Sequence, residues 1–142
     1  MPSPVDEFLS LRTAGLLAAL GLIAIALFQV ALALGAPLGR AAWGGGHDVL
    51  PTSLRIASAA AVAIWLLAAL LVTARAGIPI LPLPPGAASW GPWLVAALLF
   101  VGGIMNVASS SPWERFGWAP VALILAGLCL IVALNGPEPA TA

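Results

Sequence analysis

The sequence predicts an all-α membrane protein, in which four transmembrane helices form a bundle and a short interfacial helix precedes the fourth. Hydrophobic residues make up 62% of the 142 residues, charged residues only 7%, and the mean hydropathy is +1.11. A soluble domain carries about a quarter charged residues, because its surface must face water. Five basic and five acidic side chains cannot cover such a surface, whereas lipid accepts an apolar exterior.

Two long apolar stretches in the first half of the chain, residues 13–35 and 54–75, predict the first two transmembrane helices. About 20 helical residues cross the ~30 Å hydrocarbon core of a bilayer, and both stretches are long enough. The motif SPVD at residues 3–6 is typical of a helix start, with proline in the first turn. Asp6 and Glu7 argue against a cleaved signal peptide, whose leading segment is basic.

Two further apolar stretches, residues 90–108 and 118–135, predict the third and fourth transmembrane helices. The proline-rich segment IPILPLPPG (78–86) precedes the third stretch and cannot be helical, because proline lacks an N–H and clashes with the preceding turn. Before the fourth stretch, the motif SPWE (111–114) fits a capping box with proline in the first turn. This motif predicts a short helix over 112–117 that lies in the membrane interface.

Tryptophans mark the ends of these spans, as expected at membrane–water interfaces. Five of the six fall at span ends: Trp43, Trp90, Trp93, Trp113 and Trp118. Only Trp65 lies in the middle of a span. We therefore predict one transmembrane domain over residues 1–142, in a multi-pass protein of the cell membrane. The arginines divide three against two between the two faces, so the orientation stays open.

Charge and cysteine content exclude several function classes. The formal net charge is zero and no basic run is present, so we expect no binding of nucleic acid. The chain has one histidine and one cysteine, and neither belongs to a metal-ligand spacing. The sequence also lacks a phosphate loop, a dinucleotide fingerprint and hydrolase motifs. We expect no metal and no cofactor.

Polar residues gather at one end of the predicted bundle, around the connections between spans 1 and 2 and between spans 3 and 4. Polar residues within a membrane are costly and usually face a partner helix, a cavity or a functional site. We therefore assign a candidate ligand site to this end: Gln29, Arg40, Trp43, Arg55, Asn106, Trp113 and Arg115. If the protein is an enzyme, its acid–base groups are Asp48, Glu114 and His47, although His47 and Asp48 also fit an ordinary turn.

Several of these residues also have a structural interpretation. Arg55, at a helix entrance, would extend its charge to the lipid headgroups. Glu114 would complete the capping box of the helix that it begins. Gln29 and Asn106 would bond across the bundle, while Gly102, one turn before Asn106, would admit a neighbouring backbone.

The connection between spans 1 and 2 contains three consecutive glycines, which allow the chain to fold back over the bundle. We expect this fold-back to bring Asp48 within reach of Arg40, Arg55 or the start of the predicted helix over 112–117. Trp43 and Trp113 are expected to wall a cavity beneath the folded-back segment.

Three segments resemble a known group of proteins. The segments GRAAWGGGHDVLP (39–51), LRIAS (54–58) and NVASSSPWERFGWAPVALIL (106–125) are similar to parts of small bacterial four-helix integral membrane proteins of unknown function. The resemblance implies the same four-span topology. It implies no catalytic residues, because none are established for that group.

Three functions fit these observations. The first is a binding or accessory role, in which the bundle holds a lipophilic ligand or packs against a larger membrane complex. Small residues that favour close helix packing support it: Gly15, Ala19, Ala57, Ala61, Gly102 and Gly127. The second is a membrane-embedded acid–base enzyme that cyclises, isomerises or ring-opens a lipophilic substrate. The third is a transporter or channel, which would require a homo-oligomer because acids are absent from mid-membrane positions.

Overall fold

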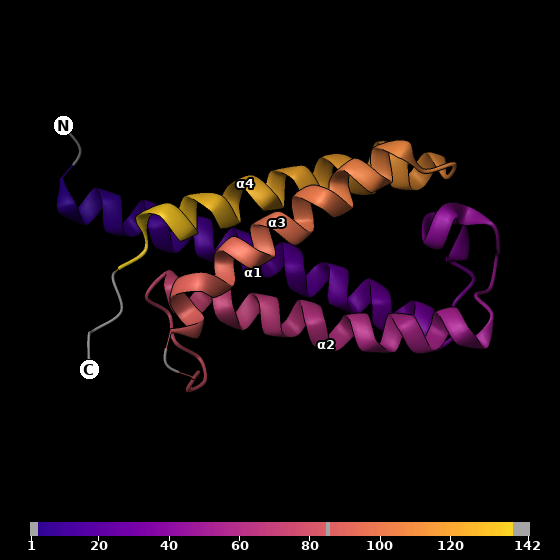
Figure 1. Ribbon diagram of the computed structural model, residues 1–142, viewed down its shortest axis with the longest axis horizontal. Helices are drawn as coiled ribbons and strands as arrows, with labels where there is room; N and C mark the ends of the chain where they lie inside the picture. Colours follow the sequence, from indigo (N-terminus) through magenta and orange to yellow (C-terminus); the bar gives the residue numbers. More distant parts are fainter. Residues whose placement is uncertain (1–2, 85, 138–142) are drawn as a thin grey trace.

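The computed structural model describes residues 3–84 and 86–137, and within these ranges every regular element is helical (Figure 1). Four helices of this described part are long and apolar enough to cross a membrane: Ser10–Ala33, Thr52–Arg75, Ala87–Ala108 and Glu114–Asn135. Each boundary lies within four residues of the one predicted from sequence. The predicted fold class is therefore confirmed, and the chain is a small multi-pass membrane helix bundle.

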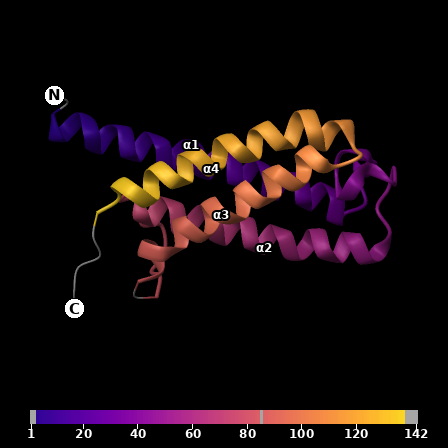
Figure 2. The same ribbon diagram turned by 45° about the horizontal axis from the view of Figure 1, so that its top comes forward.

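The helices pair as two antiparallel hairpins, α1 with α2 and α3 with α4, whose members share the most extensive contacts. The elements follow in the order α1 (Pro4–Ala33), η1 (Gly39–Ala41), η2 (Trp43–Gly45), α2 (Thr52–Arg75), α3 (Ala87–Ala108), η3 (Glu114–Trp118) and α4 (Ala119–Asn135). Figures 1 and 2 show the hairpins lying along each other, with the first and last described residues at the same end. Residues 34–51, called loop 1 below, lie at the opposite end with the α3–α4 turn.

The start of α1 confirms the helix-start motif read from the sequence. The backbone N–H of Asp6 donates to Ser3 Oγ at 3.2 Å, and the N–H of Ser3 donates to Asp6 Oδ2 at 3.1 Å. This reciprocal pair is a capping box, with Pro4 as the first helical residue. From Pro4 the helix continues unbroken to Ala33.

The segment expected as a short helix over 112–117 is helical, but it continues directly into α4. Residues Glu114–Trp118 form one π-helical turn, in which the N–H of Ala119 donates to the carbonyl of Glu114, five residues earlier. Pro120 follows immediately and cannot donate the next regular helix bond. The wider π turn accommodates this proline without ending the helix.

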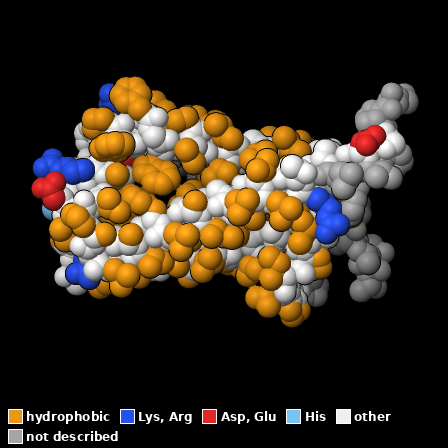
Figure 3. All heavy atoms as spheres, turned by 180° about the vertical axis from the view of Figure 1, so that it is seen from behind, with side chains coloured by type: hydrophobic (Ala, Val, Ile, Leu, Met, Phe, Trp, Pro, Cys, Tyr) orange, Lys and Arg blue, Asp and Glu red, His pale blue; other side chains and the backbone are white. Residues whose placement is uncertain are grey.

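Apolar side chains fill the interior and also cover most of the exterior. Leu22, Val72, Leu99 and Val132, one from each long helix, are almost completely buried. Large apolar residues on the outer faces are more than half exposed, including Leu20, Ile64, Phe100 and Ile124. Figure 3 shows charged side chains at the two ends of the molecule and hydrophobic side chains along its length. This distribution suits a surface that contacts lipid.

Of the three glycines expected at close helix contacts, Gly15 lies at one, whereas Gly102 and Gly127 do not. A methyl group on Gly15 would lie 2.4 Å from Cβ of Ala76, and one on Gly103 would lie 2.8 Å from Leu123. At Gly102 and Gly127, in contrast, an added methyl group would meet no atom within 4 Å. The prediction that Gly102 admits a neighbouring backbone is therefore wrong, because Gly103 faces α4 and Gly102 faces an open space.

Three arginines donate hydrogen bonds to carbonyl groups at helix C-termini, where the last turn leaves acceptors without partners. Arg55 Nε donates to the carbonyl of Ala33 at the end of α1, at 2.9 Å. Arg75, which is buried, donates to the carbonyl of Ala133 in α4 at 3.1 Å and to that of Pro137 at 2.6 Å. Arg115 caps α3 in the same way, 2.7 Å from the carbonyl of Ser109.

We predict that Gly15→Ala destabilises the bundle by about 1–3 kcal/mol, because the new methyl group would force α1 away from the rigid Cβ of Ala76. The matched control is Gly127→Ala, which adds a methyl group to open space and improves helix propensity by up to about 1 kcal/mol. Unfolding free energies from denaturant titration in detergent micelles would measure both. Equal stability of the two variants would contradict this account of the packing.

Candidate functional site

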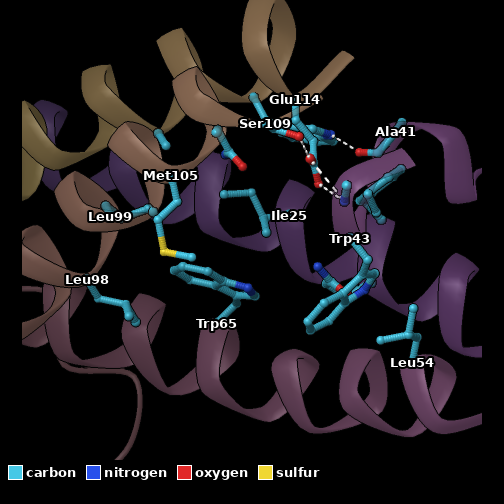
Figure 4. Close-up of a pocket in the computed structure, with 18 residues that line it drawn as sticks. Ile25, Ala41, Trp43, Leu54, Trp65, Leu98, Leu99, Met105, Ser109 and Glu114 are labelled. Atoms are coloured by element: carbon cyan, nitrogen blue, oxygen red, sulfur yellow. Dashed lines mark hydrogen bonds between the residues drawn. The ribbon is translucent and has the colours of Figure 1, made fainter. Parts of the chain in front are cut away.

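A cavity of about 590 Å³ lies between the two hairpins beneath loop 1 (Figure 4). All four long helices, loop 1 and the π-helical turn contribute to its lining. Of the residues proposed from sequence, four line this cavity: Gln29, Trp43, Asn106 and Glu114.

Loop 1 folds back over the bundle and covers the cavity, as predicted from its glycines. Gly44 and Gly45 have φ angles of +81° and +72°, which favour glycine because a Cβ is strained there. Indole N–H groups hold the loop at two points. Trp43 donates to Ser58 Oγ in α2 at 3.1 Å, and Trp118 donates to the carbonyl of Ala41 at 3.0 Å.

The serine-rich α3–α4 turn fastens loop 1 from the other hairpin. Ser110 Oγ donates to the carbonyl of Gly44 at 3.0 Å, and Ser111 Oγ donates to the carbonyl of Arg40 at 2.7 Å. Both bonds join residues far apart in the sequence. The cover of the cavity is therefore made jointly by the two hairpins.

Glu114 is the buried acid of the site, and its carboxylate accepts hydrogen bonds from both hairpins (Figure 4). The backbone N–H of Gly44 donates to both carboxylate oxygens at 3.2 Å, and the hydroxyl of Ser109 also donates to the carboxylate. The expected capping box forms only in part: Ser111 Oγ accepts from the N–H of Glu114 at 3.4 Å, while the carboxylate points to loop 1 instead. The Glu114 side chain therefore binds loop 1 and lines the cavity, and its carboxylate does not complete the capping box of its own helix.

Two amide side chains of the cavity lining lack partners. Gln29 and Asn106 both line the cavity, but they make no side-chain hydrogen bond to each other or to other described residues. The oxygen Oε1 of Gln29 is buried and without a partner. The expected bond across the bundle is therefore not formed, because the cavity separates the helices there. Buried polar atoms without partners are rare in folded proteins.

The remaining lining is largely apolar and aromatic. Trp65 extends from the middle of α2 into the cavity, and Leu98 and Met105 line it from α3 (Figure 4). The rings of Phe28 and Trp118 pack against each other with centroids 4.7 Å apart. Sequence reasoning did not assign Trp65 to the site, although its place as the one mid-span tryptophan was a usable signal.

The other candidate residues lie outside the cavity lining. Asp48 Oδ1 and Arg40 Nε form an ion pair at 2.7 Å, as expected, but both side chains are well exposed. His47 is exposed as well, and Trp113, expected as a wall, is 66% exposed and does not line the cavity. The guanidinium groups of Arg55 and Arg115 contact helix C-termini instead.

The chemistry available in the cavity comes from one carboxylate, two amides, a serine hydroxyl and aromatic rings. Asp48 and His47 do not converge on Glu114, so the acid pair proposed for an enzyme is not assembled there. No cluster of three metal-ligating side chains occurs among the residues that the structure describes. Comparisons with known proteins assign no family: no family model, no curated protein and no solved structure matches the chain.

The ion pair predicts that the acid titration of Asp48 depends on the presence of Arg40. The hydrogen bond and charge of Arg40 lower the pKa of Asp48, so the pair persists in mildly acidic solution and breaks only as the pH falls through that lowered value. We expect Arg40→Gln to return the pKa of Asp48 to its ordinary value of about 3.9. Carboxyl-carbon NMR titration would measure it.

Asp6 provides the internal control for that titration. Hydrogen bonds from Ser3 lower the pKa of Asp6, at the opposite end of the molecule, so Arg40→Gln should leave it unchanged. An Asp48 midpoint that did not respond to Arg40→Gln would show that the ion pair is not formed in solution.

Proposed function

We propose that the protein binds a lipophilic small molecule in the cavity beneath loop 1, as a small binding protein of the cell membrane. The supporting observation is the cavity itself. Its volume of about 590 Å³ falls within the range of about 300–1,000 Å³ that is typical of ligand sites. Its lining also has the usual composition, mainly apolar and aromatic with a few convergent polar groups.

The unpaired amides support a bound ligand over an empty interior. The cavity is partly open to its surroundings, and the side chains that line it gain close contacts when a molecule fills it. The free Oε1 of Gln29 and the amide of Asn106 would gain partners from a ligand that carries hydrogen-bonding groups. Gly102 leaves room that a larger side chain would occupy.

Ligand binding explains more of the observed features of this site than an accessory role, an enzyme or a transporter would. An accessory role on a larger membrane complex would use the outer apolar faces, and contact with lipid already explains these. An acid–base enzyme would depend on Glu114 alone, since Asp48 is paired with Arg40 outside the cavity. A transporter would need a second copy of the chain to complete a polar path.

We predict that Gly102→Leu blocks the cavity and weakens ligand binding by at least about tenfold, which corresponds to 1.4 kcal/mol. The measurement is quenching of tryptophan fluorescence by ω-bromododecyl probes, with the protein in lipid nanodiscs. Binding in the cavity gives a saturable component, whereas partition into lipid gives a linear one. The probes carry hydroxyl, carboxylate or trimethylammonium head groups.

Gly127→Leu is the matched control, because Gly127 is also a helical glycine with open space around it but does not line the cavity. It should retain the saturable component. If the native protein showed no saturable quenching by any of the three probes, the proposed binding function would be refuted.

A further inference from the structure

Among the described residues, no cationic group pairs with the carboxylate of Glu114. The side chain is only 8% exposed, and its hydrogen bonds come from a backbone N–H and a hydroxyl. The ion pair of Arg40 with Asp48 lies outside the cavity lining and does not include Glu114. Buried charges in proteins are usually paired, because removal from water is costly.

The chain places its own cations elsewhere. Arg55, Arg75 and Arg115 donate to carbonyl groups at helix C-termini, and Arg40 pairs with Asp48. Arg12 lies near the start of α1, away from the cavity lining. No arginine or histidine is among the residues that line the cavity. Glu114 is the one acid of that lining, so its carboxylate is the one charged side chain in the cavity lining.

Aromatic rings line the same space. Trp43, Trp65, Trp118 and Phe28 all contribute to the lining, and Figure 4 shows the rings of Trp43 and Trp65 in the cavity below Glu114. The face of an aromatic ring carries negative charge density and attracts cations, tryptophan most strongly. Rings combined with a carboxylate are the elements that recognise alkylated ammonium groups in proteins.

From these contacts, and resting on the proposed ligand cavity, we infer that the ligand is a lipophilic organic cation, an amine or quaternary ammonium compound with an apolar tail. Its head group lies among the tryptophan rings and neutralises Glu114. Its tail contacts Ile25, Leu98 and Met105. A carboxylate or phosphate head group would instead meet the charge of Glu114 without a basic side chain to offset it.

The test compares one alkyl chain with three head groups. The probes are ω-bromododecyl chains that end in trimethylammonium, hydroxyl or carboxylate, titrated into the protein in nanodiscs with tryptophan quenching as the readout. We expect the ammonium probe to bind at least about tenfold more tightly than the alcohol, and the carboxylate to bind most weakly. Glu114→Gln should abolish the preference for ammonium over alcohol, while Glu114→Asp should retain most of it.

Asp48→Asn is the charge-matched control for these variants, because it removes one negative charge from the same end of the molecule without altering the cavity lining. It should leave the preference unchanged. Titration in nanodiscs of phosphatidylcholine and of an uncharged glycolipid, which attracts cations no more strongly, separates two sources of the ammonium group. Competition in phosphatidylcholine alone would identify a choline headgroup as the occupant, and equal binding would identify a free amphiphile.

Failure of the cation inference and failure of the proposed binding function would give different results. If the alcohol bound saturably, as tightly as the ammonium probe, and Glu114→Gln had no effect, the cation inference would be overturned while the ligand cavity stood. If no probe bound saturably, the binding function itself would fail. A Glu114→Gln protein with native helicity and native alcohol binding excludes misfolding as the cause of a lost preference.

Discussion

The hydrogen bonds between the carboxylate of Glu114 and the backbone N–H of Gly44 join residues 70 positions apart and connect the two helical hairpins at one end. Loop 1 belongs to the first hairpin and Glu114 to the second, so neither hairpin can form this end alone. A buried carboxylate is tolerated only where donors surround it, and Gly44 and Ser109 supply them. Ser110 and Ser111 bond to loop 1 from the same turn, so their hydrogen bonds and those of Glu114 together hold the cover of the cavity in place.

The two ends of the bundle are closed by different means, and this difference leaves room for the cavity. At the end where α1 begins and α4 ends, the Arg75 side chain spans from α2 to the C-terminus of α4, and Gly15 allows α1 to pack directly on Ala76. At the other end, loop 1 joins the two hairpins through its hydrogen bonds to α2 and to the α3–α4 turn. The helices beneath it do not need to meet, so Gly102 and Asn106 face open space instead of a neighbour.

The four transmembrane helices could be predicted from the sequence, whereas several side-chain contacts between them could not. The four spans follow from hydropathy and length, and the fold-back of loop 1 follows from three consecutive glycines. In contrast, a lipid-facing helix is apolar on its outer and inner faces alike, so periodicity does not reveal which residues point inward. That is why Gly102 was expected at a helix contact that Gly103 makes, and why Trp65 was not assigned to the site. The partner of Glu114 depends on tertiary structure, which a local capping motif cannot encode.

The proposed binding of a lipophilic cation beside Glu114, in the cavity beneath loop 1, can be tested by crystallography. A crystal structure of the protein grown with ω-bromododecyl-trimethylammonium tests it most directly, because the anomalous signal of bromine locates the tail. We expect a bromine peak within the cavity, near Leu98 and Met105, with the ammonium group between Glu114 and the tryptophan rings. Bromine peaks confined to the outer, lipid-facing surface, with the cavity empty or closed by its own side chains, would contradict it.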